Sequence, residues 1–142
     1  KKMIDSSLRT LPDREHTLIA GSSMGGLMSL YAVTAYNEIY GRAAALSPSF
    51  YFGGQQLHSL IIQTPLRSPT RVYMDLGTGE IPAGRRKALS ELFLSAAELT
   101  ASGADVAARA VPGAKHNEAA WEKRIPVFMD YLLPKAEEES IS

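Results

Sequence analysis

Four short apolar segments, separated by stretches of helical character, limit the folds open to this chain more than any other feature of its sequence. They cover residues 16–20, 42–46, 71–76 and 105–111, and we expect each to be a β-strand. Each is followed at once by glycine, serine or proline, as buried strands that end in a turn commonly are. Strands that alternate with helices pair in parallel, so the sequence predicts an α/β fold.

The segments between these strands carry the patterns of helices. We expect helices over residues 3–10, 24–36, 57–62, 85–101 and 117–133. The second is apolar on nearly all sides, which is typical of a buried helix. Pro126 lies inside the last and should kink it unless it begins a new turn. No repeat or linker divides the chain, so we predict a single domain over residues 1–142.

Composition argues against several classes of function. The chain of 142 residues has 15 Lys and Arg against 15 Asp and Glu, which gives a net charge of zero and no electrostatic basis for binding nucleic acid or an anionic membrane. No apolar run approaches the ~18 residues of a membrane-spanning helix. The absence of cysteine excludes disulfides and thiolate metal sites, and no His, Asp or Glu pair has metal-ligand spacing. We therefore expect no metal and no cofactor, while the compartment stays open.

Residues 21–25 read Gly-Ser-Ser-Met-Gly, a G-x-S-x-G motif between the first strand and a helix. The glycines permit a sharp reversal of the chain, so that the hydroxyl of Ser23 stands above the sheet as a nucleophile. The backbone N–H of Met24 then lies at the helix N-terminus, where it can bind an oxyanion. The alternative is a simple tight turn in which Ser22 or Ser23 caps the helix.

An acid and a base follow the third and fourth strands, at the edge of the sheet where active residues of parallel sheets lie. Glu80 lies in the loop after the third strand, whereas Asp75 is still inside it; His116 follows the fourth strand. Taken alone, Glu80 also fits a surface acid at a helix start, and His116 an exposed loop residue. The order Ser23, Glu80, His116 is the nucleophile–acid–base order of α/β-hydrolases, and it favours a catalytic triad.

The remaining histidines and aromatic residues carry weaker signals. His16 precedes the first strand and His58 lies in the variable stretch 50–69, and we expect both to have surface roles. Phe50 and Tyr51 follow the end of the second strand. They fit either a pocket for an acyl or aryl group or core packing beneath a loop.

Several segments carry a resemblance to a known family. They are residues 11–16, 19–26, 45–49, 75–80 and 116–121. Together they resemble the putative-esterase family of α/β-hydrolases, which includes siderophore, feruloyl and acetyl-xylan esterases, esterase D and mycolyltransferases. The resemblance implies a serine esterase for small-molecule esters, with Ser23 as nucleophile, His116 as base and Glu80 as acid. Some siderophore esterases act with serine and histidine alone.

One departure from the family pattern concerns the N-terminal side. Family members have several strands, and a loop with the second oxyanion donor, before the helix that begins here at Met3. We therefore expect a partial α/β-hydrolase fold: a fragment, or half of an assembly that another chain completes. A bare sheet edge is an aggregation hazard that a symmetric homo-oligomer would cover.

This departure also bears on activity. Loss of one oxyanion donor slows acyl transfer about 10²–10³-fold, so we expect the isolated chain to be a weak or inactive esterase. Two alternatives remain at this point. One is an acyltransferase that uses the same residues; the other is a non-catalytic scaffold or oligomerising fragment.

Overall fold

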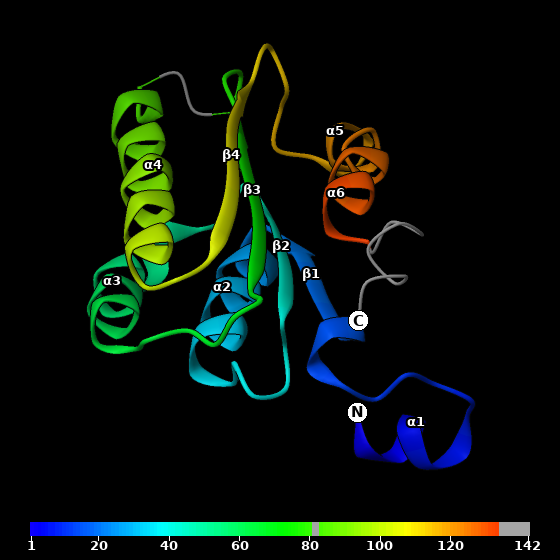
Figure 1. Cartoon of the computed structure of the whole chain (residues 1–142). Helices are drawn as coiled ribbons and strands as arrows, with labels where there is room; N and C mark the ends of the chain where they lie inside the picture. Colours follow the sequence, from blue (N-terminus) through cyan, green and yellow to red (C-terminus); the bar gives the residue numbers. More distant parts are fainter. Residues whose placement is uncertain (81–82, 134–142) are drawn as a thin grey trace.

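A four-stranded parallel sheet forms the centre of the molecule (Figure 1). The computed structural model describes residues 1–80 and 83–133. The strands, in their spatial order, are β1 (Leu18–Ser22), β2 (Arg42–Leu46), β3 (Arg71–Gly77) and β4 (Asp105–Val111). Leu18 aligns with Arg42, and Arg71 aligns with both Arg42 and Asp105. All four strands therefore end at the same edge of the sheet, and the predicted α/β fold is confirmed.

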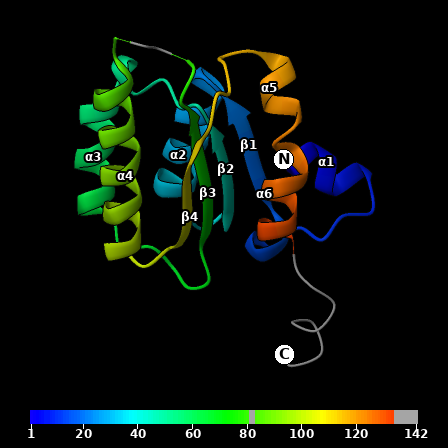
Figure 2. The ribbon, with the colours of Figure 1, turned by 90° about the horizontal axis from the view of Figure 1, so that it is seen from above.

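Helices cover both faces of the sheet (Figure 2). One face packs against α2 (Met24–Ala35), α3 (Gly54–Gln63) and α4 (Arg85–Ala101). The other face packs against α6 (Ile125–Leu132), which follows the short α5 (Glu118–Glu122). The remaining elements are α1 (Lys2–Ser7) and two 3₁₀ helices, η1 (Arg14–His16) and η2 (Phe50–Phe52). The sheet is thus the middle of three layers.

The alternation of side chains along β3 explains why the strands are apolar on both sides. Val72 and Met74 point into the core shared with α2, α3 and α4, and both are fully buried. Tyr73 points the other way, into the smaller core formed with Phe128 and Leu132 of α6. Because successive strand residues face opposite sides and both sides are covered, an apolar residue is favoured at nearly every position.

Two expected element boundaries are wrong. The first strand begins at Leu18 rather than at residue 16, because Asp13 accepts a hydrogen bond from the backbone N–H of His16 and caps η1 there. The expected helix over 117–133 is two helices, and Pro126 lies in the first turn of α6, where its missing N–H costs no helical hydrogen bond. The smaller differences lie at the helix ends: α1 ends at Ser7, and α3 extends over Gly54–Gln63.

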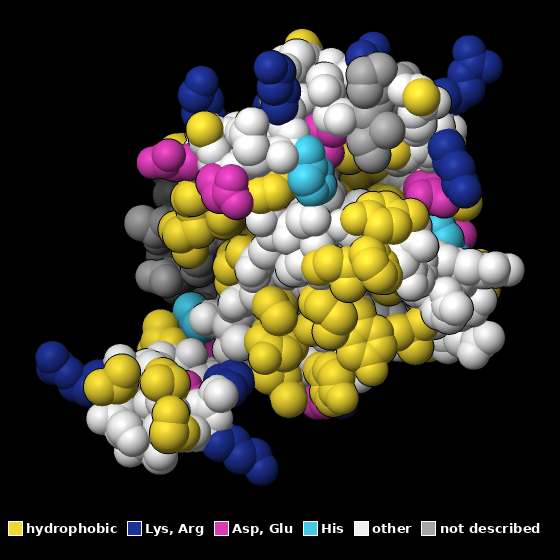
Figure 3. All heavy atoms as spheres, turned by 180° about the vertical axis from the view of Figure 1, so that it is seen from behind, with side chains coloured by type: hydrophobic (Ala, Val, Ile, Leu, Met, Phe, Trp, Pro, Cys, Tyr) yellow, Lys and Arg dark blue, Asp and Glu magenta, His cyan; other side chains and the backbone are white. Residues whose placement is uncertain are grey.

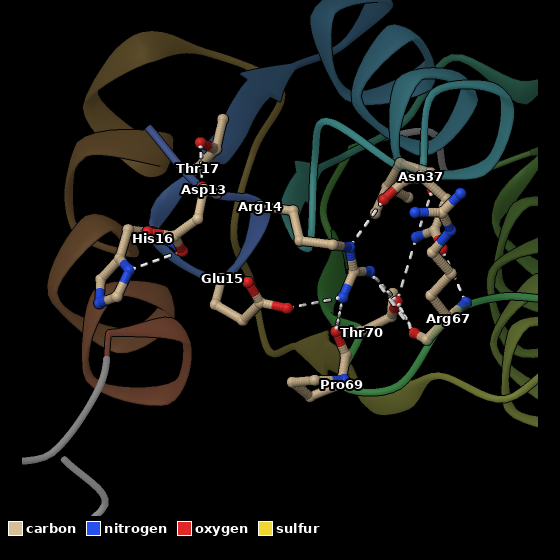
Figure 4. A network of polar contacts seen from close by, with 10 residues as sticks. Asp13, Arg14, Glu15, His16, Thr17, Asn37, Arg67, Pro69 and Thr70 are labelled. Carbon is tan, nitrogen blue, oxygen red and sulfur yellow. Dashed lines mark hydrogen bonds and ion pairs between the residues drawn. The ribbon is translucent and has the colours of Figure 1, made fainter. Parts of the chain in front are cut away.

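Arg14 ties together three loops at the amino ends of the strands (Figure 4). Its Nε donates to the carbonyl of Asn37 at 2.9 Å, and Nη1 donates to the carbonyl of Pro69 at 2.7 Å. Its Nη2 donates to the Thr70 hydroxyl at 2.8 Å. The carbonyl of Arg14 itself accepts from Gly41 N–H at 3.0 Å, just before β2. These hydrogen bonds hold together the segments that precede β1, β2 and β3 at the amino edge of the sheet.

Two exposed features accompany the sheet. Within the described residues, β1 pairs only with β2 and so forms one edge. Hydrophobic side chains also gather on the face that carries α2, where Met24, Met28 and Tyr31 are exposed (Figure 3). In the part of the chain that the structure describes, no helix has the length and apolar character to cross a membrane.

Candidate active site

A polar side chain follows the carboxyl end of each strand. Ser23 follows β1, Ser47 follows β2, Glu80 lies in the turn after β3, and His116 lies in the loop after β4. Because the strands are parallel and in register, these four segments meet above one edge of the sheet. The structure thereby brings together Ser23, Glu80 and His116, which the sequence analysis singled out.

Ser23 occupies a strained turn between β1 and α2. Its backbone is left-handed, with φ 57° and ψ −120°, which is uncommon for a residue other than glycine. The turn is tight enough that a Cβ on Gly21 would lie 2.5 Å from the carbonyl carbon of Gly25. Ser23 stands at the N-cap position of α2 but makes no capping hydrogen bond. Its hydroxyl oxygen lies instead 2.9 Å from Nε2 of His116.

The other imidazole nitrogen of His116 faces Glu80. Nδ1 lies 2.9 Å from Oε2 of the Glu80 carboxylate. The two side chains differ in exposure, 36% for His116 and 2% for Glu80, so the acid is buried beneath a base that solvent reaches. The indole of Trp121 meets the imidazole edge-on at a centroid distance of 4.8 Å. A buried carboxylate in this position can hold the imidazole in one tautomer.

Glu80 is held on its other oxygen as well. Oε1 accepts a hydrogen bond from the backbone N–H of Gly77 at 2.8 Å and another from the hydroxyl of Ser47. Gly77 permits this approach because a Cβ there would lie 2.2 Å from the carbonyl oxygen of Ala114 and 2.8 Å from Glu80 itself. Nη2 of Arg124 lies 4.0 Å from the same carboxylate oxygen. Each oxygen of Glu80 thus has a polar neighbour.

Asp75 does not contact His116, in agreement with the expectation that it stays within the sheet. It is fully buried and accepts a hydrogen bond from the Tyr73 hydroxyl at 2.8 Å. Nη2 of Arg124 lies 3.1 Å from its other oxygen. Burial raises the pKa of Asp75, although the Tyr73 hydrogen bond and the Arg124 charge oppose that shift. Burial likewise raises the pKa of Tyr73, which therefore stays protonated and remains a donor.

A cavity of about 170 Å³ opens beside the imidazole. Both predicted pocket residues line it, together with His116 and Glu80. Phe50 is buried and also belongs to the main core, whereas Tyr51 is largely exposed at the rim. Phe50 therefore both packs in the core and lines this cavity.

The backbone at the start of α2 adds a donor to the site. The N–H of Met24 belongs to the first turn of the helix, where no acceptor within the helix is available to it. It directly follows Ser23, so it lies beside the hydroxyl that faces His116. Its position fits the predicted oxyanion donor.

The other predicted polar residues lie away from this cluster. Nδ1 of His16 lies 2.7 Å from Asp13 near the amino edge of the sheet. His58 is mostly buried and pairs with Glu98 of α4, so its expected surface role is not what the structure has. Among the described residues, no group of three or more His, Cys, Asp or Glu side chains could hold a metal ion.

Sequence reasoning missed four polar residues of the site. They are Ser47, Ser49, Trp121 and Arg124. Ser49 is buried, and its hydroxyl lies 3.0 Å from that of Ser23. The serines follow the second strand directly, in a segment that resembles the esterase family, and Trp121 ends another such segment. Nothing in the sequence pattern distinguishes Arg124 from other residues of the last helical segment.

The parallel sheet, its flanking helices and the arrangement of the strand-end residues are those of an α/β-hydrolase fold, of which this chain covers a part. A family model described as "Putative esterase" matches residues 1–132. The chain therefore belongs to the putative esterase family, as the sequence motifs predicted. No curated protein matches the sequence.

Solved structures share the fold over most of this chain. The enterobactin esterase FES from Shigella flexneri aligns with 92% of this chain and 34% of its own, at 22% identity and a TM-score of 0.73. A ferulic acid esterase aligns with 92% of this chain and 56% of its own, at 14% identity and a TM-score of 0.71. S-formylglutathione hydrolase (FrmB) from Staphylococcus aureus aligns with 92% of this chain and 56% of its own, at 16% identity and a TM-score of 0.67. This chain spans little more than half of these structures at most.

Proposed function

We propose that this chain carries the catalytic residues of a serine esterase, which hydrolyses a carboxylic ester through an acyl-enzyme. The observation that carries the proposal is the continuous line of contacts from Ser23 through His116 to Glu80, with both nitrogen–oxygen distances at 2.9 Å. This is the geometry that a nucleophile, its base and the group that orients the base require. The names of solved structures with this fold, a ferulic acid esterase and an enterobactin esterase among them, support ester hydrolysis.

In the acylation step, the oxygen of Ser23 attacks the ester carbonyl carbon while its proton passes to Nε2 of His116. The carbonyl oxygen becomes an oxyanion, and the N–H of Met24 donates a hydrogen bond to it. When the intermediate collapses, the bond to the alcohol oxygen breaks and His116 returns the proton to the leaving alcohol. The Glu80 carboxylate stabilises the imidazolium that forms.

Deacylation repeats these steps with water in place of the alcohol. His116 takes a proton from the water, which attacks the acyl carbon, and the proton then returns to Ser23 as the acid leaves. The cavity beside His116, with Phe50 and Tyr51 in its wall, receives the acyl or aryl part of the ester in this proposal. With Met24 as the one assigned oxyanion donor, we expect slow turnover, about 10²–10³-fold below a site with two donors.

The experiment is the intact mass of the protein after incubation with a fluorophosphonate, which phosphonylates activated serines. We expect a single adduct on the wild-type chain and none on Ser23→Ala. Ser22→Ala is the matched control, because it removes the neighbouring hydroxyl of the same motif and should leave the adduct in place. An adduct that persists in Ser23→Ala, or its absence from the wild-type chain, would contradict the proposal.

We also propose that the free edge of β1 pairs with another chain, in the simplest case a second copy. Along that edge the backbone N–H and C=O groups have no partner strand in the described residues. Such an edge is a template for strand addition. Sedimentation equilibrium tests this proposal: a concentration-dependent dimer supports it, and a monomer at all concentrations contradicts it.

A further inference from the structure

Ser47 is a buried residue in a backbone conformation that favours glycine. Its φ is 49°, and only 1% of its surface is exposed. Serine at such a position costs backbone strain without contributing apolar burial, so its hydroxyl is the group that explains its presence. We propose that Ser47 is a positioning residue, whose hydroxyl sets the direction of the hydrogen bonds that run through Glu80 to His116. This inference rests on the proposed esterase function.

The direction of these bonds follows from the donors around Ser47. Its oxygen accepts a hydrogen bond from Nε1 of Trp121 at 3.1 Å and one from Nη2 of Arg124 at 2.8 Å. An indole N–H and a guanidinium can only donate, so both lone pairs of the hydroxyl oxygen are occupied. The one proton of Ser47 is therefore left for the remaining neighbour, Oε1 of Glu80.

The consequence reaches the base. Oε1 of Glu80 receives two hydrogen bonds, from Ser47 and from the N–H of Gly77, and so it acts only as an acceptor. Two donated bonds stabilise the negative form of a carboxylate. An ionised Glu80 in turn requires a proton on Nδ1 of His116, which leaves Nε2 free to accept the proton of Ser23. One orientation of the Ser47 hydroxyl thus selects the catalytically useful tautomer.

Arg124 supplies the charge in this arrangement. Its side chain is 3% exposed and lies between two buried carboxylates, those of Asp75 and Glu80. Arg109 of β4 adds positive charge near Asp75, while Lys87 and Glu91 of α4 line the cavity together with Glu80. Arg124→Met would remove the positive charge that lies 4.0 Å from Glu80, and a positive charge disfavours an imidazolium near it.

The test measures the rate of phosphonylation of Ser23 by a fluorophosphonate between about pH 5 and pH 9, the range in which histidine titrates. We expect Ser47→Gly and Ser47→Ala each to slow labelling about 10-fold to 100-fold, as expected when a hydrogen bond to a charged group is lost. Ser47→Gly relieves the left-handed strain and so keeps the variant folded. Ser95→Ala is the control and should label at the wild-type rate, because it removes another fully buried serine hydroxyl that has no hydrogen-bond partner in the described residues and does not line the cavity.

The pH profile separates positioning from mere structural support. In Arg124→Met the rise in rate on the acid side should move to higher pH, whereas Arg124→Lys should keep it near the wild-type position because the charge remains. Loss of structure alone would lower the rate at every pH without moving the profile. Wild-type labelling rates in both Ser47 variants would overturn the inference. A slow rate in Ser47→Ala with a wild-type rate in Ser47→Gly would also overturn it, because both variants lack the hydroxyl and differ only in backbone strain. Labelling that persists in Ser23→Ala would instead overturn the proposed function.

Discussion

Two arginines, one at each edge of the sheet, have opposite surroundings. Arg14 at the amino edge uses all three of its nitrogens, and most of its acceptors are neutral carbonyls or hydroxyls. Arg124 at the carboxyl edge faces two buried carboxylates, while its Nε and Nη1 have no hydrogen-bond partner within the described residues. Satisfied donors stabilise a fold, whereas buried and partly unsatisfied charge is costly. The comparison indicates that the amino edge stabilises the fold, whereas the carboxyl edge carries a cost in stability that its proposed catalytic role explains.

The largest expected effect lies at the carboxyl edge. His116→Ala should lower the rate of Ser23 phosphonylation about 10²–10⁴-fold, because a positioned general base contributes that much. The free energy of unfolding should change little, since the imidazole is 36% exposed. Labelling kinetics and urea unfolding measure the two quantities.

His16→Ala provides the matched control for that variant. His16 is similarly exposed, at 32%, and also lies beside a carboxylate, 2.7 Å from Asp13. It belongs to the amino edge, so its removal should leave the labelling rate unchanged. A loss of rate as large as that of His116→Ala would break the distinction between the two edges.

The next largest effect lies at the amino edge, where we expect a loss of stability without a loss of labelling rate. Arg14→Met should lower the free energy of unfolding by about 2–3 kcal/mol, because each partly buried acceptor that loses its donor costs ~1–3 kcal/mol. The labelling rate of the folded variant should stay within about twofold of wild type, since Arg14 lies at the far edge of the sheet. Unchanged stability in urea unfolding would contradict the structural role of Arg14.

The two glycines of the G-x-S-x-G motif differ in their surroundings, so substitutions at them test how tight the turn at Ser23 is. Gly21→Ala should destabilise the fold by about 1–3 kcal/mol, as overpacking does, because the new methyl group would lie 2.5 Å from the Gly25 backbone. Gly25→Ala is the control: a Cβ there meets nothing within 4 Å, so the stability should be retained. Equal losses in thermal unfolding would show that the tightness of the turn does not explain the motif.

The smallest effect concerns pH. Because burial raises the pKa of Asp75, the folded protein holds that proton more tightly than the unfolded chain does. Between the two pKa values the folded state binds more protons, so this group makes stability fall as pH rises. Asp75→Asn removes the contribution, and its stability relative to wild type should improve as pH rises above the usual range of an aspartate, about 4. Urea unfolding at several pH values should reveal the slope; a difference that is constant with pH, or of opposite sign, would contradict it.

The parts of the fold that the sequence predicted are those set by local pattern. Alternating apolar strands and helices predicted the parallel sheet. Ser23, Glu80 and His116 were predicted to meet because each follows a strand end, and their side chains do lie within hydrogen-bond distance of one another. The start of β1 was missed because one side chain, Asp13, caps a 3₁₀ turn in front of it. The break before α6 depended on whether Pro126 kinks a helix or begins one, and both fit the sequence.

The support behind Glu80 was out of reach of sequence reasoning. Ser47 contacts Trp121 and Arg124 across 74 and 77 residues of chain, respectively. Ser47 and Trp121 lie in segments that resemble the esterase family, but the resemblance assigned no role to either, and Arg124 lies outside those segments. Contacts of this kind depend on how α5 packs over the carboxyl edge of the sheet. Only the three-dimensional structure brings these residues together.

The most direct measurement of the central claim is the mass of the protein during reaction with 4-nitrophenyl acetate, quenched in acid and mapped by peptide. We predict one acetyl group on Ser23, present in the wild-type chain and absent from Ser23→Ala. A single turnover is sufficient for this result, so even a slow esterase passes the test. Release of nitrophenol with no acetyl group on Ser23, or with acetyl groups on lysines alone, would contradict the account.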